Sequence, residues 1–272
     1  MPELPEVETL VTGLKPHVIG KTIRKINVFR PLPILPLKPT EFIRAVESKK
    51  IVDLTRRAKY LIFHLKPELY LLTHLRMTGK FLLTNHLKLP EKHHRIWFHL
   101  GKKKLLVFED VRCLGKMELA TKVTLCQKLS LLGVEPLSKK LNVSYFHKCC
   151  NETIRPIKVV LMDQRKIAGI GNIYASEILF QAGIHPERQA KFLTHIERKQ
   201  ITQAIKSILK KAIQLQGTSV SNFRLVDNKM GEFQNFLNVY GKAGQPCPKC
   251  NRSIERIVQY QRSTFFCPQC QR

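Results

Sequence analysis

Residues 60–84 have the sequence YLIFHLKPELYLLTHLRMTGKFLLT. Three short runs of large apolar residues, at 60–65, 69–75 and 80–84, are separated by turn-forming residues. Similar runs, with aromatic and β-branched residues, occupy 22–29, 95–100 and 104–111. Short strands at such spacing are typical of sandwiches and barrels. We therefore predict a β-sandwich or barrel of about 100 residues, from Lys21 to Leu119.

The segment before these strands has the period of a helix. Apolar residues at helical spacing predict a helix over 6–20 that ends at Gly20. The stretch PLPILPLKPT, residues 31–40, contains four prolines and is expected to be a loop or a sheet edge. A short helix is expected over 41–48.

The second half of the chain has helical periods. Helices are expected over 125–133, 144–153, 157–164, 172–183 and 195–217, followed by a loop over 218–240. Apolar runs at 254–260 and 263–267 predict a terminal hairpin. The fold class is therefore α+β.

The composition is strongly basic. The 272 residues include 47 Lys and Arg against 20 Asp and Glu, a formal net charge of +27. Such a charge favours a nucleic-acid partner, although a merely solvated basic surface remains the alternative. The sequence predicts neither a membrane span nor a signal peptide, so we expect a cytoplasmic protein with reduced cysteines.

Four of the eight cysteines have metal-ligand spacing. Cys247 and Cys250 form one C-x2-C pair, and Cys267 and Cys270 form the second. Two such pairs joined by a hairpin predict a zinc ribbon with one structural, non-catalytic Zn²⁺. The hairpin carries basic residues that suit phosphate contact, and by itself it would equally suit protein binding. The remaining cysteines, Cys113, Cys126, Cys149 and Cys150, are expected to be buried or partly buried apolar residues.

The segment IAGIGN, residues 167–172, lies between two helical stretches. Gly169 and Gly171 permit a tight turn, and Asn172 is predicted to be the N-cap of the second helix. A helix N-terminus beside Lys158 and Lys166 suits phosphate binding. An ordinary helical hairpin with a capping Asn is the alternative at this point.

Five segments in order carry a resemblance to a known family. They are MPELPEVET at 1–9, LTHLRMTGKF at 72–81, DVRCLG at 110–115, GIGNIYASEILFQAGIHP at 169–186, and the cysteine pairs. Together they resemble bacterial formamidopyrimidine-DNA glycosylase, over essentially the whole chain. The resemblance implies an N-terminal helix on a two-sheet β-sandwich (1–122), a helix-two-turn-helix domain (123–240) and a zinc finger (241–272). It further implies that double-stranded DNA lies in a cleft with the damaged base flipped out.

The resemblance implies covalent chemistry at the N-terminus. Removal of Met1 would expose the amine of Pro2, and a free α-amine has a pKa of roughly 8, which leaves a useful neutral fraction near neutral pH. Glu3 is implied as the general acid/base and Lys59 as a catalytic lysine near the lesion phosphate. Glu6 either bonds backbone amides near the helix start or handles a later proton. Taken singly, proline and glutamate there are simply favourable first-turn residues.

The resemblance also implies a set of DNA contacts. Met77 would fill the gap left by the flipped base, and Arg112 would pair with the orphaned cytosine. Phosphate contacts are implied for His74, Asn172, Tyr240 and Arg262, with Lys158 as a weaker candidate.

Two positions depart from the family pattern. Leu114 stands where an intercalating Phe is usual, and Ser221 stands where the loop over the extruded base usually carries a basic residue. The implied function is excision of 8-oxoguanine and formamidopyrimidines with β,δ-elimination, by a monomer. The alternatives are a lesion-binding or abasic-site-binding protein that does not cut, and a glycosylase that prefers oxidised pyrimidines.

Overall fold

The computed structural model describes residues 1–85, 89–101, 104–219 and 230–272. The chain forms two compact units. The first comprises Met1–Ser130 with Gln216–Glu232, and the second comprises Leu131–Leu215 with Phe233–Arg272. The sequence-based division into 1–122, 123–240 and 241–272 stays a prediction.

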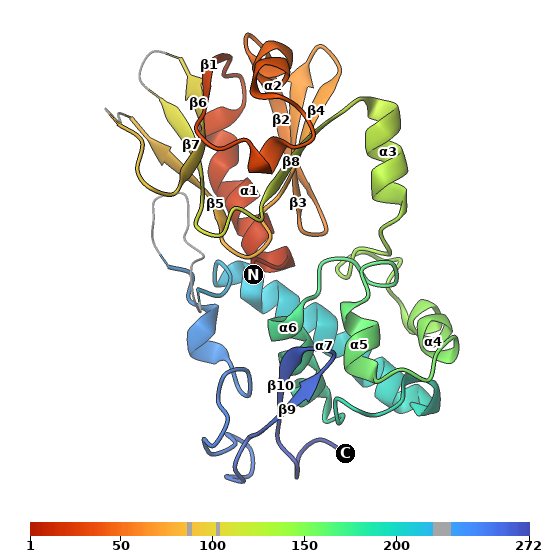
Figure 1. Ribbon diagram of the computed structural model, residues 1–272. Coiled ribbons are helices and arrows are strands. Elements are labelled where there is room, and N and C mark those ends of the chain that lie inside the picture. The colour runs from red at the N-terminus through yellow and green to blue at the C-terminus, as the bar shows by residue number, and fades with distance from the viewer. Residues whose placement is uncertain (86–88, 102–103, 220–229) are drawn as a thin grey trace. The chain divides into compact units, whose positions relative to one another are not determined.

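The first unit is built around a helix and two antiparallel four-stranded sheets. Helix α1 (Leu4–Val18) lies between the sheets in Figure 1. One sheet has the order β2 (Lys50–Arg57), β3 (Tyr60–Lys66), β4 (Leu69–His74) and β8 (Lys116–Ala120). The other has the order β1 (Ile23–Val28), β6 (His94–Leu100), β7 (Leu105–Asp110) and β5 (Gly79–Thr84). The predicted two-sheet sandwich is confirmed.

One apolar core joins the helix to both sheets. Val7, Leu10 and Leu14 of α1 are fully buried against Leu54 and Phe81, which come from different sheets. Burial of large apolar side chains is the main stabilising contribution, roughly 1.5–3 kcal/mol for each. The core thereby fixes the direction of α1, and with it the position of the N-terminal residues.

Local differences from the sequence-based expectations have physical causes. Helix α1 begins at Leu4, earlier than expected, because Glu3 and Glu6 form a capping box at its start. Strands β2 and β8 were not expected, since charged residues interrupt their apolar pattern. The proline-rich stretch contains the short 3-10 helix η1 (Leu32–Ile34), and α2 (Pro39–Val46) begins inside it. Helix α3 (Lys122–Ser130) exposes Cys126, so the expectation that this cysteine is buried is wrong.

The second unit is helical with a terminal hairpin. It contains α4 (Val143–Asn151), α5 (Ile157–Met162), α6 (Asn172–Ala182), η2 (Ala190–Phe192), α7 (His195–Gln214), η3 (Phe233–Phe236), β9 (Glu255–Gln259) and β10 (Arg262–Phe266). Nearly all of α6 is buried, and it packs against α5, α7 and β10 (Figure 1). A capping box of Thr194 and Glu197 starts α7. The expected helices and hairpin are confirmed.

The turn before α6 follows the sequence expectation only in part. Gly169 adopts φ +108°, which a residue with a side chain would rarely adopt, and this allows the tight turn. The prediction that Asn172 is the N-cap is wrong, because the cap is Gly171. The Asn172 side chain is instead bonded to Lys158 and to the Ser263 carbonyl.

Within the described ranges, no helix is both long enough and apolar enough to cross a membrane.

Candidate active site and nucleic-acid interface

The residues at the start of α1 are buried and fixed. Pro2 is buried, and Glu3 and Glu6 are each 2% exposed. The Glu3 amide donates to Glu6 Oε2 at 2.7 Å. A buried carboxylate costs free energy unless it is hydrogen-bonded, so this bond both satisfies Glu6 and sets the path of the preceding residues.

The second oxygen of Glu6 holds a distant loop. The Thr218 amide donates to Glu6 Oε1 at 2.8 Å, across 212 residues of sequence. Gly217 adopts φ +79°, and a Cβ there would lie 2.9 Å from Glu6 Oε1. The Gly231 amide donates to Ser219 Oγ at 2.9 Å, which joins the two ends of this loop. Glu6 therefore ties the base of the loop to the start of α1.

Ser221, the departure noted in this loop, lies outside the described residues. The backbone bonds of Glu6 fit the first of its two expected roles.

Lys59 is only 5% exposed, in the turn between β2 and β3. Its neighbour Ala58 has φ +52°. Arg56 Nε donates to Glu8 Oε2 at 2.5 Å, and Arg56 Nη1 donates to the Ala58 carbonyl at 3.0 Å. Through Arg56, the turn that carries Lys59 is attached to the first turns of α1.

His74 is electrostatically coupled to Lys59. Burial, followed by the positive charges of Arg76 and Lys59, lowers the pKa of His74 to about 3. The ring is therefore neutral near pH 7 in the free protein. Its Nδ1 accepts from the Arg76 amide at 3.0 Å, so the proton resides on Nε2. His74 can thus donate one hydrogen bond to a phosphate without carrying a charge.

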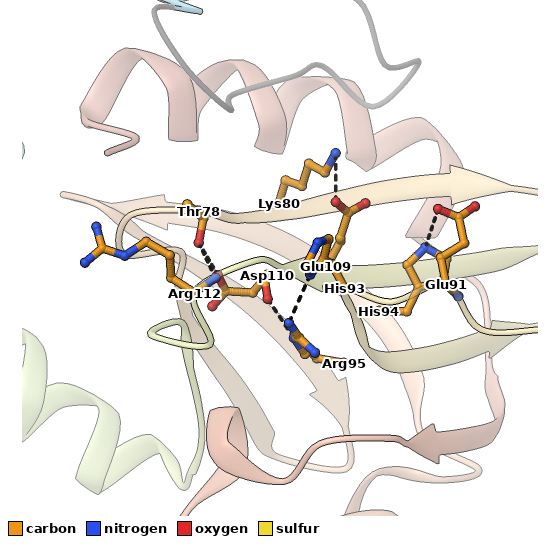
Figure 2. A network of polar contacts seen from close by, with 9 residues as sticks. All are labelled: Thr78, Lys80, Glu91, His93, His94, Arg95, Glu109, Asp110 and Arg112. Atoms are coloured by element: carbon orange, nitrogen blue, oxygen red, sulfur yellow. Dashed lines mark hydrogen bonds and ion pairs between the residues drawn. The ribbon is translucent and has the colours of Figure 1, made fainter.

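The residues expected to fill and read the DNA gap are exposed. Met77 is 39% exposed and Leu114 is 43% exposed, and Arg112 is also exposed. Met77 lies in the loop between β4 and β5, while the other two lie in the loop between β7 and β8. In Figure 2 the Arg112 guanidinium points away from a buried polar network centred on Asp110. Asp110 is not among the site residues predicted from the sequence, because nothing in its local pattern distinguishes it from other acidic residues.

In the second unit, Lys158 faces inward. It is 2% exposed, and its Nζ donates to Asn172 Oδ1 at 2.7 Å, to Thr264 Oγ1 at 2.6 Å and to the Ser263 carbonyl at 3.3 Å. Asn172 Nδ2 also donates to the Ser263 carbonyl, at 2.9 Å. Lys158 therefore connects α5, the N-terminus of α6 and strand β10.

Tyr240 is placed by a buried carboxylate that is not among the residues predicted from the sequence. Glu177 is fully buried, and its Oε1 accepts from the Val239 and Tyr240 amides, each at 2.9 Å. Its Oε2 accepts from the Asn238 amide, also at 2.9 Å. The Tyr240 ring makes an edge contact with Phe265 of β10, with a centroid separation of 5.2 Å. Only the tertiary fold reveals Glu177, because its partners lie more than 60 residues away.

The four cysteines of the hairpin fit one zinc ion. Their sulfur atoms all lie within 4.8 Å of one another. Cys247 Sγ and Cys270 Sγ are 3.9 Å apart, and Cys250 Sγ and Cys267 Sγ are 3.5 Å apart. Tetrahedral ligands with Zn–S bonds of about 2.3 Å have sulfur atoms about 3.8 Å apart. Four thiolates fill the coordination sphere, so these residues hold a structural zinc.

Basic residues surround an open pocket beside the hairpin. The pocket has a volume of about 500 Å³, and Arg155, Arg165 and Arg262 are among its lining residues. Arg262 is exposed, while Arg155 forms an ion pair with Asp163 at 3.1 Å. The excess of positive charge suits a phosphate group.

Known proteins resemble this chain along its whole length. The formamidopyrimidine-DNA glycosylases of Carboxydothermus hydrogenoformans and Listeria innocua are each 40% identical to it, and each alignment covers both chains completely. The chain belongs to the formamidopyrimidine-DNA glycosylase family. Family models match residues 1–117 (formamidopyrimidine-DNA glycosylase N-terminal domain), 132–224 (formamidopyrimidine-DNA glycosylase H2TH domain) and 244–272 (zinc finger found in FPG and IleRS).

Solved structures of the family show the same fold. A complex of a Lactococcus lactis FPG variant with Fapy-dG containing DNA has a TM-score of 0.94 and 34% identity, with full coverage of both chains. A complex of Lactococcus lactis Fpg with abasic-site DNA has a TM-score of 0.93 and 33% identity, with 99% coverage of both. Membership of the formamidopyrimidine-DNA glycosylase family makes this chain a DNA glycosylase of base excision repair, in a family with glycosylase and AP lyase activity.

Proposed function

We propose that this protein removes oxidised purines, 8-oxoguanine and formamidopyrimidines, from double-stranded DNA and then cuts the resulting abasic strand. The observation that carries the proposal is the fixed start of α1. Buried Pro2 and Glu3 are held by the Glu6 bond, and buried Lys59 belongs to a turn that Arg56 attaches to the same helix. We expect the enzyme to act as a monomer.

The proposed nucleophile is the Pro2 amine, released by removal of Met1. Its lone pair attacks C1′ of the damaged nucleotide, and the bond between C1′ and the base breaks as the base leaves with a proton. Glu3 protonates the ring oxygen as the sugar opens, and loss of the amine proton gives an iminium at C1′.

The iminium then drives strand cleavage. It acidifies C2′, so that loss of a C2′ proton expels the 3′ phosphate and a second elimination expels the 5′ phosphate. Hydrolysis of the iminium restores the amine. Lys59, with its positive charge beside neutral His74, holds the phosphate next to the lesion.

The exposed Met77, Arg112 and Leu114 are proposed to occupy the gap left by the extruded nucleotide. Arg112 donates to the orphaned cytosine. In the second unit, Arg262, Tyr240 and Asn172 bind phosphates, and the surrounding positive charge predicts steep loss of binding with salt. The solved Lactococcus lactis complexes with lesion and abasic DNA support a DNA partner.

Borohydride trapping tests the covalent step. Zinc-loaded protein whose mass shows loss of Met1 is incubated with duplex containing 8-oxoguanine opposite C, in the presence of borohydride. Reduction of the iminium is expected to leave a stable amine between Pro2 and the sugar, located by peptide mass analysis. In Pro2→Leu, the bulky second residue should prevent removal of Met1, and the adduct should disappear. Pro31→Leu, in an exposed position of the 31–40 loop, is the matched control. Absence of the adduct with processed wild-type protein contradicts the proposal and leaves a DNA-binding protein that does not cut.

A broader lesion range is the second candidate. One similar solved structure is a complex of Lactococcus lactis FPG with an oxidised-pyrimidine-containing DNA, and Leu114 replaces the usual aromatic wedge. Single-turnover excision of 8-oxoguanine opposite C, compared with thymine glycol, separates the two preferences. Faster excision of thymine glycol would overturn the preference for purines.

A further inference from the structure

Asp110 is a fully buried carboxylate at the end of β7. Its Oδ1 accepts a short hydrogen bond from the Thr78 hydroxyl and a second bond from the Arg112 amide at 3.2 Å. Its Oδ2 accepts from the Gly115 amide at 2.7 Å. Thr78 Oγ1 in turn accepts from the Arg112 amide at 3.0 Å. In Figure 2 Thr78 and Arg112 lie on one side of Asp110, and Arg95 lies on the other.

This one carboxylate connects two separate loops. Thr78 directly follows Met77 in the loop between β4 and β5, and the Arg112 and Gly115 amides bracket Leu114 in the loop between β7 and β8. Of the three residues proposed to enter the DNA gap, Arg112 is itself bonded to Asp110 through its amide. Met77 and Leu114 each precede a residue that is bonded to Asp110, Thr78 and Gly115 respectively.

Close packing fixes both loops further. A Cβ at Gly115 would lie 2.6 Å from the Phe108 ring, and one at Gly79 would lie 2.6 Å from the Leu75 carbonyl oxygen. Cys113 adopts φ +53°, a left-handed conformation that costs free energy and must be held by its surroundings. The loops therefore have little freedom to rearrange while the bonds to Asp110 remain.

Arg95 supports the same loop from its other side. It is 6% exposed, and its guanidinium donates to the main-chain carbonyls of Asp110 at 2.6 Å and Val111 at 3.3 Å. Arg95 thus bonds the main chain of Asp110, while the carboxylate of Asp110 accepts from Thr78 and from the Gly115 amide.

We propose that Asp110, acting with Thr78, is a positioning residue for base reading, which presets Met77, Arg112 and Leu114 for insertion into the DNA gap. The proposal rests on the function proposed above and deepens it. Loops that are ordered before binding lose less conformational entropy when the DNA binds, so more of the contact free energy remains for base extrusion and for reading the opposite base.

Two substitutions alter the network without changing its shape. Thr78→Val removes the hydroxyl that bridges the loops. Asp110→Asn places an amide NH2 opposite a backbone N–H, so that either the Gly115 or the Arg112 bond is lost. Three duplexes are used with full-length, zinc-loaded protein: 8-oxoguanine opposite C, 8-oxoguanine opposite A, and a preformed abasic site opposite C.

Both variants are expected to lower the single-turnover rate on 8-oxoguanine opposite C by about 10- to 100-fold, the effect of losing one hydrogen bond to a charged group. The ratio of rates opposite C and opposite A should fall toward 1, because Arg112 no longer sits where it reads cytosine. Cleavage of the preformed abasic site should keep most of its rate, since no base has to be extruded. A fluorescent cytosine analogue opposite a tetrahydrofuran abasic site should show a smaller emission change on binding.

The controls separate positioning from general stability. Thr78→Ser retains the hydroxyl and should restore the ratio. Thr55→Val removes another threonine side-chain bond, between Thr55 Oγ1 and His64 Nε2 at 2.8 Å in the other sheet, and should keep the ratio. Equal losses on all three duplexes, or an unchanged ratio in both network variants, would overturn the role of Asp110. Failure of wild-type protein to cleave any duplex would instead overturn the proposed function.

Discussion

Two loops of the sandwich unit and the start of α6 in the helical unit place their residues in different ways. In the sandwich unit Met77, Arg112 and Leu114 are exposed, and a buried carboxylate holds the backbone beneath them. In the helical unit Lys158, the weaker candidate for a phosphate contact, is itself buried and bonded to protein partners. A residue that belongs to a DNA-binding motif can therefore have either of two roles. It contacts DNA itself, or it holds in position another residue that contacts DNA.

The sandwich and the zinc hairpin are also stabilised differently. The sandwich has a continuous apolar core, and bonds to the buried carboxylates of Asp110 and Glu6 hold its loops. The zinc hairpin has a small core of Phe180, Val239 and Ile254 with two of the cysteines, and Lys158 bonds it to the start of α6. We therefore expect its stability to depend on the metal and on Lys158.

The largest effect is expected from loss of zinc. In Cys250→Ser the hairpin should unfold, because structural zinc contributes on the order of 10 kcal/mol to such small folds. Binding to lesion duplex should then fall by about two orders of magnitude, the scale of losing several phosphate contacts. Trp97, the single tryptophan, is buried in β6 of the sandwich, so its fluorescence should not change.

Metal content by native mass spectrometry and duplex binding by anisotropy check this expectation. Cys126→Ser, at an exposed position of α3, is the control and should behave as wild type. A changed Trp97 signal in Cys250→Ser would show that the sandwich also depends on the metal.

The next effect separates Lys158 from Arg262. Lys158→Met should lower the free energy of unfolding by about 1.5–3 kcal/mol, because charge-assisted bonds to Asn172 and Thr264 are lost. It should leave the slope of log K against log salt unchanged. Arg262 is exposed, so Arg262→Gln should leave the free energy of unfolding unchanged. It should reduce the slope of log K against log salt by about 0.9. Denaturant unfolding and salt titrations measure both quantities. A reduced salt slope with unchanged stability in Lys158→Met would make Lys158 a direct phosphate ligand.

These internal partners mark the limit of what sequence patterns predict. The helices, most strands and the zinc ligands follow from local periods and spacings, and they were predicted. Strands β2 and β8 were missed because charged residues interrupt their alternation. The bonds from Lys158 to Thr264 and from Glu6 to Thr218 join residues 106 and 212 positions apart, so no local pattern encodes them. Asp110 and Glu177 were missed for the same reason: a buried acid is recognised only from the amides that converge on it.

A smaller, pH-dependent effect is expected from His74. Its pKa is lowered to about 3 in the folded protein, against an ordinary value of 6.5. The unfolded chain therefore binds an extra proton between these values, and stability falls as the pH drops below 6.5, by at most about 1.4 kcal/mol per pH unit. His74→Gln removes this contribution.

Urea unfolding at pH 7.5 and pH 5, monitored by Trp97 fluorescence, measures the contribution of His74. Other histidines with lowered pKa values, His64, His94 and His99, contribute equally to both proteins and cancel in the difference. Between pH 7.5 and pH 5 the free energy of unfolding should fall by up to about 2 kcal/mol more in wild type than in His74→Gln. Parallel losses would show that His74 is protonated in the folded state.

The smallest effect is a gain, expected from Leu114→Phe. An aromatic ring at this exposed position can stack on a neighbouring base, worth roughly 1 kcal/mol at the lower end of the usual range, or about fivefold in affinity for abasic-site duplex. Val52→Phe, at a similarly exposed position of β2, is the control and should not change the affinity. The gain should vanish in the Asp110→Asn background, because a ring on an unfixed loop must first be ordered. A gain that persists there would mean that the wedge acts independently of the carboxylate, and that the exposed residues of the sandwich need no more internal placement than Arg262 does in the helical unit.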